Sequence, residues 1–120
     1  MKLLSEILIA FVAAEHIYIL WLEMFAWTIS ARKTFKSFPA DLFEKTKSMA
    51  GNQGLYNGFL AAGLIWSLLI TDPVWSTHIA YFFLCCVIVA GIYGALTVQK
   101  SIFFVQSMPA ILALLVRLLS

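Results

Sequence analysis

Charged side chains are scarce in this sequence. Asp, Glu, Lys and Arg make up 12% of its 120 residues, whereas apolar residues make up 62%. A typical soluble domain contains roughly 25% charged and 45–50% apolar residues. Because so short a chain can bury only a modest fraction of its surface, water is a poor solvent for it. The composition therefore indicates an integral membrane protein, and a net charge of +2 gives no reason to expect a nucleic-acid partner.

Cysteine is almost absent as well. Cys85 and Cys86 are the two cysteines, and adjacent residues cannot form an ordinary loop-closing disulfide. Within an apolar run we interpret them as small buried hydrophobes. Soft-metal ligation together with Met24, Met49 or Met108 is the alternative, but the sequence has no metal-type spacing. Nor does it contain a nucleophile motif, a phosphate-binding loop or a haem-type ligand pair, so we expect no metal and no cofactor.

Long apolar segments are what the sequence does have. A membrane-spanning helix needs roughly 20 mostly apolar residues. Four segments qualify: residues 4–29, 48–70, 77–98 and 102–119. Their short connections make consecutive helices antiparallel neighbours. We therefore expect an all-α fold in which residues 1–120 form a single integral membrane bundle of four transmembrane helices. Small residues at four-residue spacing, such as Gly54, Gly58 and Ala62, favour close packing of the helices.

The basic residues are distributed unevenly among the connections. The first connection carries Arg32, Lys33, Lys36, Lys45 and Lys47, the third carries Lys100, and the second carries none. Connections rich in Lys and Arg stay on the cytoplasmic side of a membrane. The sequence therefore predicts a multi-pass cell-membrane protein whose first and third connections are cytoplasmic and whose termini are both external.

Several polar residues interrupt the apolar segments, and they are the candidate ligand or proton sites. They are Glu15, His16, Tyr18 and Glu23 in the first segment, Asn52, Gln53, Tyr56 and Asn57 in the second, and Gln106 in the fourth. Charged groups inside a bilayer usually face the bundle interior. At a rise of about 1.5 Å per residue, all of them except Glu15, His16 and Tyr18 lie in the cytoplasmic half. We expect these six to converge on one interior site, with Glu15 and His16 nearer the midplane.

Three functions are compatible with such a cluster. The first is binding or transport of a small molecule or cation, with Glu15, His16 and Glu23 as proton or ligand sites. Four helices are few for a transporter, so a homodimer is then expected. The second is a membrane enzyme that uses Glu23 as general acid or base on a lipid-like substrate. The third is an assembly subunit. For Gln106 alone, helix packing is the simpler explanation.

Four stretches of the sequence resemble a known family. They are Glu15-His16-x-Tyr18-x-x-x-x-Glu23-Met24-Phe25-x-Trp27, Asn52-Gln53-Gly54-Leu55-Tyr56-Asn57-Gly58-Phe59-Leu60-Ala61, Gly91-Ile92-Tyr93-Gly94-Ala95 and Gln106-Ser107-x-Pro109-Ala110. They are similar to a small family of bacterial membrane proteins known as domain of unknown function 1304. The resemblance covers nearly the whole chain, and its asparagine-rich motif is the most specific part. It implies four transmembrane helices in a bacterial inner membrane and does not imply an activity.

Overall fold

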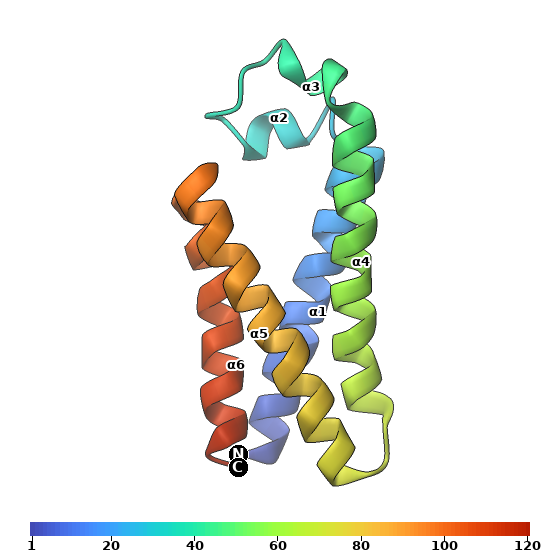
Figure 1. Ribbon diagram of the computed structural model, residues 1–120, viewed down its shortest axis with the longest axis vertical. Helices are drawn as coiled ribbons and strands as arrows, with labels where there is room; N and C mark the ends of the chain where they lie inside the picture. Colours follow the sequence, from blue (N-terminus) through green and yellow to red (C-terminus); the bar gives the residue numbers. More distant parts are fainter.

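The computed structural model describes residues 1–120 and consists of helices and short connections, as the sequence predicts. In chain order the elements are α1 (Lys2–Phe25), α2 (Ala31–Thr34), α3 (Leu42–Lys45), α4 (Lys47–Leu69), α5 (Pro73–Thr97), the π-helical turn η1 (Phe103–Ser107) and α6 (Met108–Leu118). The four long helical stretches run side by side, with η1 continuing into α6 (Figure 1). Both termini lie at one end of this bundle, and α2 and α3 lie at the other.

The bounds of the helices follow from local chemistry. α5 begins at Pro73, earlier than the predicted residue 77, because the Asp72 carboxylate accepts hydrogen bonds from the N–H groups of Val74 (2.9 Å) and Trp75 (3.3 Å). A proline in the first helical position completes this start signal. α1 ends at Phe25 instead of residue 29, because the chain turns at Ala26 into the connection that carries α2 and α3.

The turn η1 has a cause in the sequence. Pro109 has no N–H to donate to the carbonyl four residues earlier, so the regular helical ladder is interrupted. The N–H of Met108 instead bonds to the carbonyl of Phe103, five residues back. The Ser107 hydroxyl donates to the carbonyl of Ile88 on α5 (2.9 Å). A Cβ atom at Gly91 would overlap the Ser107 side chain, so only glycine permits this contact.

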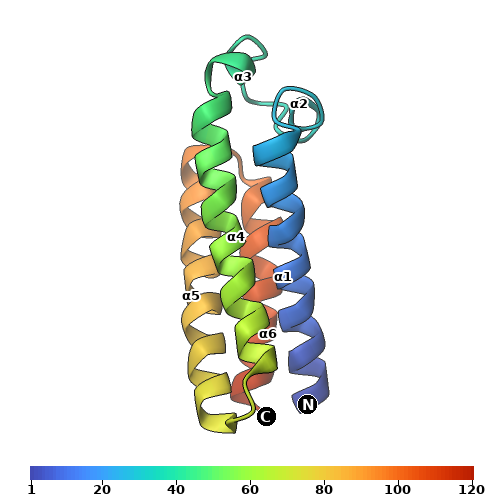
Figure 2. The ribbon, with the colours of Figure 1, turned by 90° about the vertical axis from the view of Figure 1, so that its right-hand side faces the viewer.

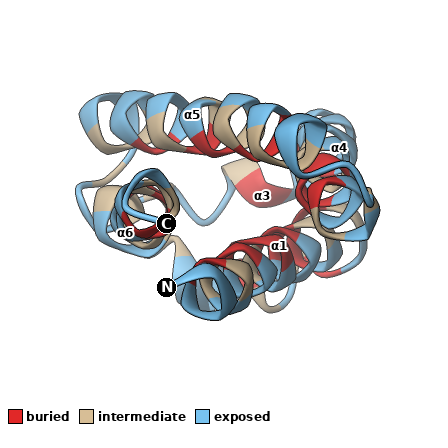
Figure 3. Cartoon of the chain, turned by 90° about the horizontal axis from the view of Figure 1, so that it is seen from below, coloured by how far each residue is buried: buried red, intermediate tan, exposed pale blue.

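The main apolar core lies between the four long helices. Its fully buried members include Val12 on α1, Leu64 on α4, Leu84 on α5 and Ala113 on α6. Figure 3 shows the buried residues on the inward sides of these helices. α1 packs against α4 along much of its length, as Figure 2 shows. A second, smaller cluster lies at the α2–α3 end and contains Leu22, Ala26, Ala31 and Phe43.

Two of the helices, α1 and α5, are long and apolar enough to cross a membrane. The apolar stretch Phe103–Leu118 is shorter. α4 is long, but the polar run that begins at Asn52 lowers its apolar character. The expectation of four membrane spans therefore stays a prediction.

Candidate functional site

A cavity of about 670 Å³ lies at the α2–α3 end of the bundle. It is bounded by α1, α4, α5, η1 and the connection between α1 and α4. α4 and α5 diverge toward this end (Figure 1). Sites for small organic molecules typically measure about 300–1,000 Å³ and combine apolar walls with a few polar groups. The volume falls within that range, and 13 of the 20 lining residues are hydrophobic.

Glu23 supplies the carboxylate of the cavity. Glu23 is 3% exposed and projects from the inward side of α1. Gln53 Nε2 donates to Glu23 Oε2 (2.9 Å), and Asn57 Nδ2 donates to Glu23 Oε1 (2.6 Å). Both amides come from one face of α4 because they are four residues apart. Each carboxylate oxygen thus has one amide donor, and the carboxylate orientation is fixed by two hydrogen bonds.

Aromatic side chains form much of the remaining wall. They are Trp27, Phe35, Phe38, Tyr56, Phe59 and Tyr93. Trp27 packs against Phe35 and Phe38, with ring centroids 5.7 and 5.8 Å away. Its indole Nε1 donates to Thr46 Oγ1 (3.0 Å), which fixes the ring and joins the two ends of the α1–α4 connection. Trp27, Phe35 and Phe38 of the α1–α4 connection therefore cover this end of the cavity, and we call them the aromatic roof. The Trp27–Thr46 hydrogen bond holds the connection in place.

The structure brings together five of the six residues that were expected to share one site. Glu23, Gln53, Tyr56, Asn57 and Gln106 all line the cavity. The prediction was wrong for Asn52, which is exposed and does not line it. Neighbouring residues of a helix point about 100° apart, and Gln53, rather than Asn52, occupies the face toward Glu23.

The remaining candidates of α1 lie away from the cavity. Tyr18 is exposed and packs beside Trp21, with ring centroids 5.8 Å apart. His16 is fully buried, and its Nδ1 lies 2.9 Å from the carbonyl oxygen of Val12. His16 Nε2 and Glu15 Oε1 are buried without a hydrogen-bond partner. Of the three α1 residues that we expected as proton or ligand sites, Glu23 lines the cavity, whereas Glu15 and His16 do not.

Sequence reasoning missed the aromatic roof. Trp27 lies only four residues after Glu23, but α1 ends at Phe25, so helix geometry does not determine the direction of its side chain. Phe35 and Phe38 lie in a polar connection, where no periodic pattern distinguishes them from loop residues. Tyr93 carries a weak signal, because it lies within the glycine-flanked stretch that α5 contributes to the cavity wall.

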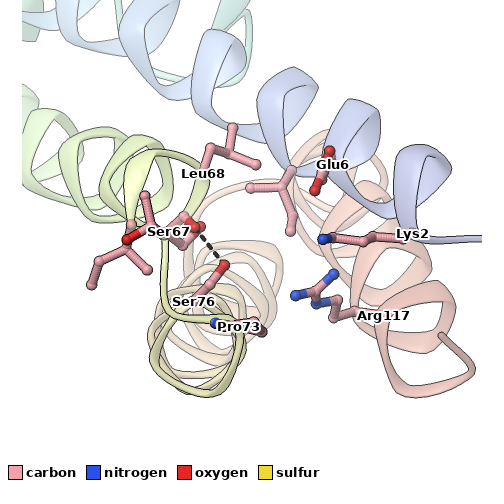
Figure 4. A pocket seen from close by; sticks show the side chains of 10 residues that line it. Lys2, Glu6, Ser67, Leu68, Pro73, Ser76 and Arg117 are labelled. Carbon is pink, nitrogen blue, oxygen red and sulfur yellow. Dashed lines mark hydrogen bonds between the residues drawn. The ribbon is translucent and has the colours of Figure 1, made fainter.

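A second, much smaller pocket lies at the end that holds the termini. Its volume is about 60 Å³, and Lys2, Glu6, Ser67, Ser76 and Arg117 are among its lining residues (Figure 4). Arg117 Nη2 donates to Thr77 Oγ1 (2.8 Å), and the Ser76 hydroxyl donates to the carbonyl of Ser67 (2.6 Å). These hydrogen bonds join α6 to α5 and α5 to α4, so the pocket lies where side chains link neighbouring helices.

The fold and the cavity define a class: a small helical bundle with a buried, amide-held carboxylate in an otherwise largely apolar cavity. The chain belongs to the family described as protein of unknown function (DUF1304), whose model matches residues 10–118. This confirms the resemblance seen in the sequence. The chain is also similar to the uncharacterized protein YpaA of Lactococcus lactis subsp. lactis (strain IL1403). The two are 35% identical over 119 residues, which cover 96% of this chain and 97% of that protein. No solved structure matches the chain.

Proposed function

We propose that all four long helical stretches cross the bacterial inner membrane, with the α1–α4 connection cytoplasmic and both termini external. Large apolar side chains are exposed on the outer faces, including Phe11 and Ile17 on α1, Phe82 on α5 and Leu115 on α6. Contiguous exposed apolar surface marks contact with lipid or with another protein. The termini share one end of the bundle, as an even number of spans requires (Figure 1). The basic side chains of the α1–α4 connection favour the cytoplasmic side for the other end.

Within this bundle we propose that the cavity binds, and passes across the membrane, a small organic molecule. The observation that carries the proposal is the Glu23 carboxylate, held by Gln53 and Asn57 in the wall of a 670 Å³ cavity. Burying a carboxylate is costly unless it has partners, and helix packing alone does not need one. A homodimer, expected because four helices are few for transport, belongs to the same proposal.

The enzymatic alternative has less support. General acid–base chemistry on a lipid-like substrate usually needs a second titratable group beside the first. Glu15 and His16 were the candidates, and neither lines the cavity that contains Glu23. The cavity's other polar side chains are amides and hydroxyls, which bind and orient a ligand but do not exchange protons readily at neutral pH.

A cavity-filling variant tests the binding proposal. Ala90 is on α5 and lines the cavity, whereas its neighbour Val89 is 65% exposed and does not. We expect wild-type protein, released from detergent in a native mass spectrometer, to retain a bound small molecule of defined mass. Ala90→Trp should abolish that mass addition and Val89→Trp should preserve it. If all three proteins carry the same adducts, or none carries any, the cavity is not a binding site for a retained molecule.

The topology is tested separately. Cys85 and Cys86 are replaced by serine, and single cysteines are introduced at Ser37 or Ser120. In intact cells a membrane-impermeant maleimide should label position 120 and should label position 37 only after the membrane is opened. The reverse pattern would invert the proposed orientation.

A further inference from the structure

We propose that the cavity selects organic cations, meaning molecules with an ammonium or similar monovalent positive group attached to an apolar body. This inference rests on the proposed small-molecule function and adds the class of ligand. It is carried by two features that meet in one place: a buried carboxylate without a cationic partner from the chain, and a wall rich in aromatic rings.

The carboxylate has unused capacity. A carboxylate offers about four acceptor sites, and the amides of Gln53 and Asn57 occupy one on each oxygen. No Lys, Arg or His lines the cavity, so the chain supplies no positive charge there. Arg32, a basic residue of the nearby connection, is occupied elsewhere. Its Nε donates to the carbonyl of Thr28, and its guanidinium lies 5.5 Å from the ring centroid of Phe43, which does not line the cavity.

The amide donors partly offset the cost of burying a charge on Glu23. Both oxygens of Glu23 accept N–H groups, and acceptance at both oxygens stabilises the charged form. A buried negative charge is strongly unfavourable until a positive charge comes close. A cationic ligand supplies that charge. An anionic ligand would place a second negative charge beside the first, and a neutral ligand would leave the carboxylate unpaired.

The aromatic wall suits the same ligand. The negative face of an aromatic ring attracts a cation within about 6 Å of its centroid, and the attraction increases when water is excluded. Six lining residues are aromatic, and Trp27 is four residues after Glu23 in the sequence. Proteins commonly bind quaternary ammonium groups by surrounding them with aromatic rings.

The cavity is less suited to a metal ion. Ca²⁺ and Mg²⁺ require six or more oxygen ligands, supplied mostly by carboxylates, carbonyls and water. The chain has no group of three His, Cys, Asp or Glu residues that could hold a metal. Gln53 and Asn57 present N–H donors to the Glu23 carboxylate, and not the amide oxygens that a metal ion would need as ligands.

Three probes of related shape and different charge test the inference: tetraphenylphosphonium, neutral triphenylphosphine oxide and tetraphenylborate. Protein-dependent binding is measured by equilibrium dialysis with the full-length protein in nanodiscs, and empty nanodiscs supply the partitioning background. We expect wild type to bind the cation more tightly than the neutral probe and not to bind the anion. Glu23→Gln should weaken cation binding roughly 10- to 100-fold, because the Coulomb attraction between the carboxylate and the phosphonium charge is lost. Its affinity for the neutral probe should stay within about 3-fold.

Two further variants make the result interpretable. Glu15→Gln removes a half-buried carboxyl of α1 that lies outside the cavity, and it should leave all affinities unchanged. Tyr56 is 60% exposed and lines the cavity, so Tyr56→Leu removes a ring at little risk to folding. Tyr56→Leu should weaken cation binding by about 3-fold or more. It therefore tests the inference even if Glu23→Gln fails to fold.

The outcomes separate this inference from the function on which it rests. Equal binding of the cation and the neutral probe, insensitive to Glu23→Gln, overturns cation selectivity and leaves the small-molecule site standing. Binding of none of the probes also overturns cation selectivity. In that case the proposed small-molecule function is decided by the mass-spectrometry comparison of wild type with Ala90→Trp and Val89→Trp.

Discussion

The two ends of the bundle are built from the same four helices, yet one is closed and the other encloses a large cavity. At the end with the termini, the remaining pocket is about 60 Å³. At the α2–α3 end it is about 670 Å³. The difference follows from α5, which stays in contact with the last helical stretch but diverges from α4 toward the α2–α3 end (Figure 1).

Glycines mark the divergence of α5 from α4. Near the closed end, a Cβ atom at Gly63 of α4 would overlap the ring of Phe83, so α4 and α5 are in direct contact there. Toward the open end, Gly91 and Gly94 of α5 are approached instead by Ser107 and Ile102 of the last helical stretch. α5 therefore follows η1 and separates from α4. The cavity is the space between them, and the α1–α4 connection covers it.

The first prediction compares a leucine-to-alanine substitution in the closed core with one beside the cavity. Leu84 is fully buried in the closed core, whereas Leu60 is half-buried and lines the cavity. Leu84→Ala should lower the free energy of unfolding by about 2–5 kcal/mol, because it leaves a void among packed side chains. Leu60→Ala should cost less than about half as much, because it enlarges an existing space. Reversible denaturation in mixed micelles measures both, and equal losses would contradict the division into closed and open halves.

A second prediction concerns the contact that draws α5 toward η1. Gly91→Ala should destabilise the fold by roughly 1–3 kcal/mol, because the new methyl group meets the Ser107 side chain and the Ser107 backbone nitrogen (2.9 Å). The matched control is Gly51→Ala on α4, where a Cβ atom meets nothing within 4 Å. That change should be neutral or stabilising by up to about 1 kcal/mol, since alanine favours helix. If both variants have the same melting temperature, the close approach at Gly91 does not determine the position of α5.

The sequence predicts the helical class and the family, and the depth argument anticipates which polar residues of α4 and η1 share a level with Glu23. It does not predict the cavity. Depth along a helix specifies only one coordinate of a side chain. The prediction for Asn52 is wrong because the direction of a side chain also depends on how the helix is rotated against its neighbour. The divergence of α4 and α5 depends on contacts at Gly63 and Gly91 that are far apart in the chain. The roof depends on Phe35 and Phe38, which no periodicity identifies.

The smallest expected effect concerns the roof of the open end. The Ser37 hydroxyl donates to Gln99 Oε1 (2.9 Å), which links the middle of the α1–α4 connection to the turn after α5. On its other side this connection is anchored by Phe43 and by the bond from Trp27 to Thr46. Loss of the exposed Ser37 bond should therefore leave stability within about 0.5 kcal/mol of wild type.

Ser37→Ala should instead change how fast a ligand enters and leaves. If the roof opens on the Ser37 side, association and dissociation of tetraphenylphosphonium should both accelerate by a similar factor, so that its Kd stays within about 2-fold. Rapid-filtration measurements on nanodiscs provide both rates. Ser48→Ala, an exposed serine on α4 outside the cavity lining, is the control and should change neither. A faster dissociation without faster association would mean that Ser37 stabilises the bound state, and unchanged rates would place the entrance elsewhere, between α4 and α5 on the side that faces lipid.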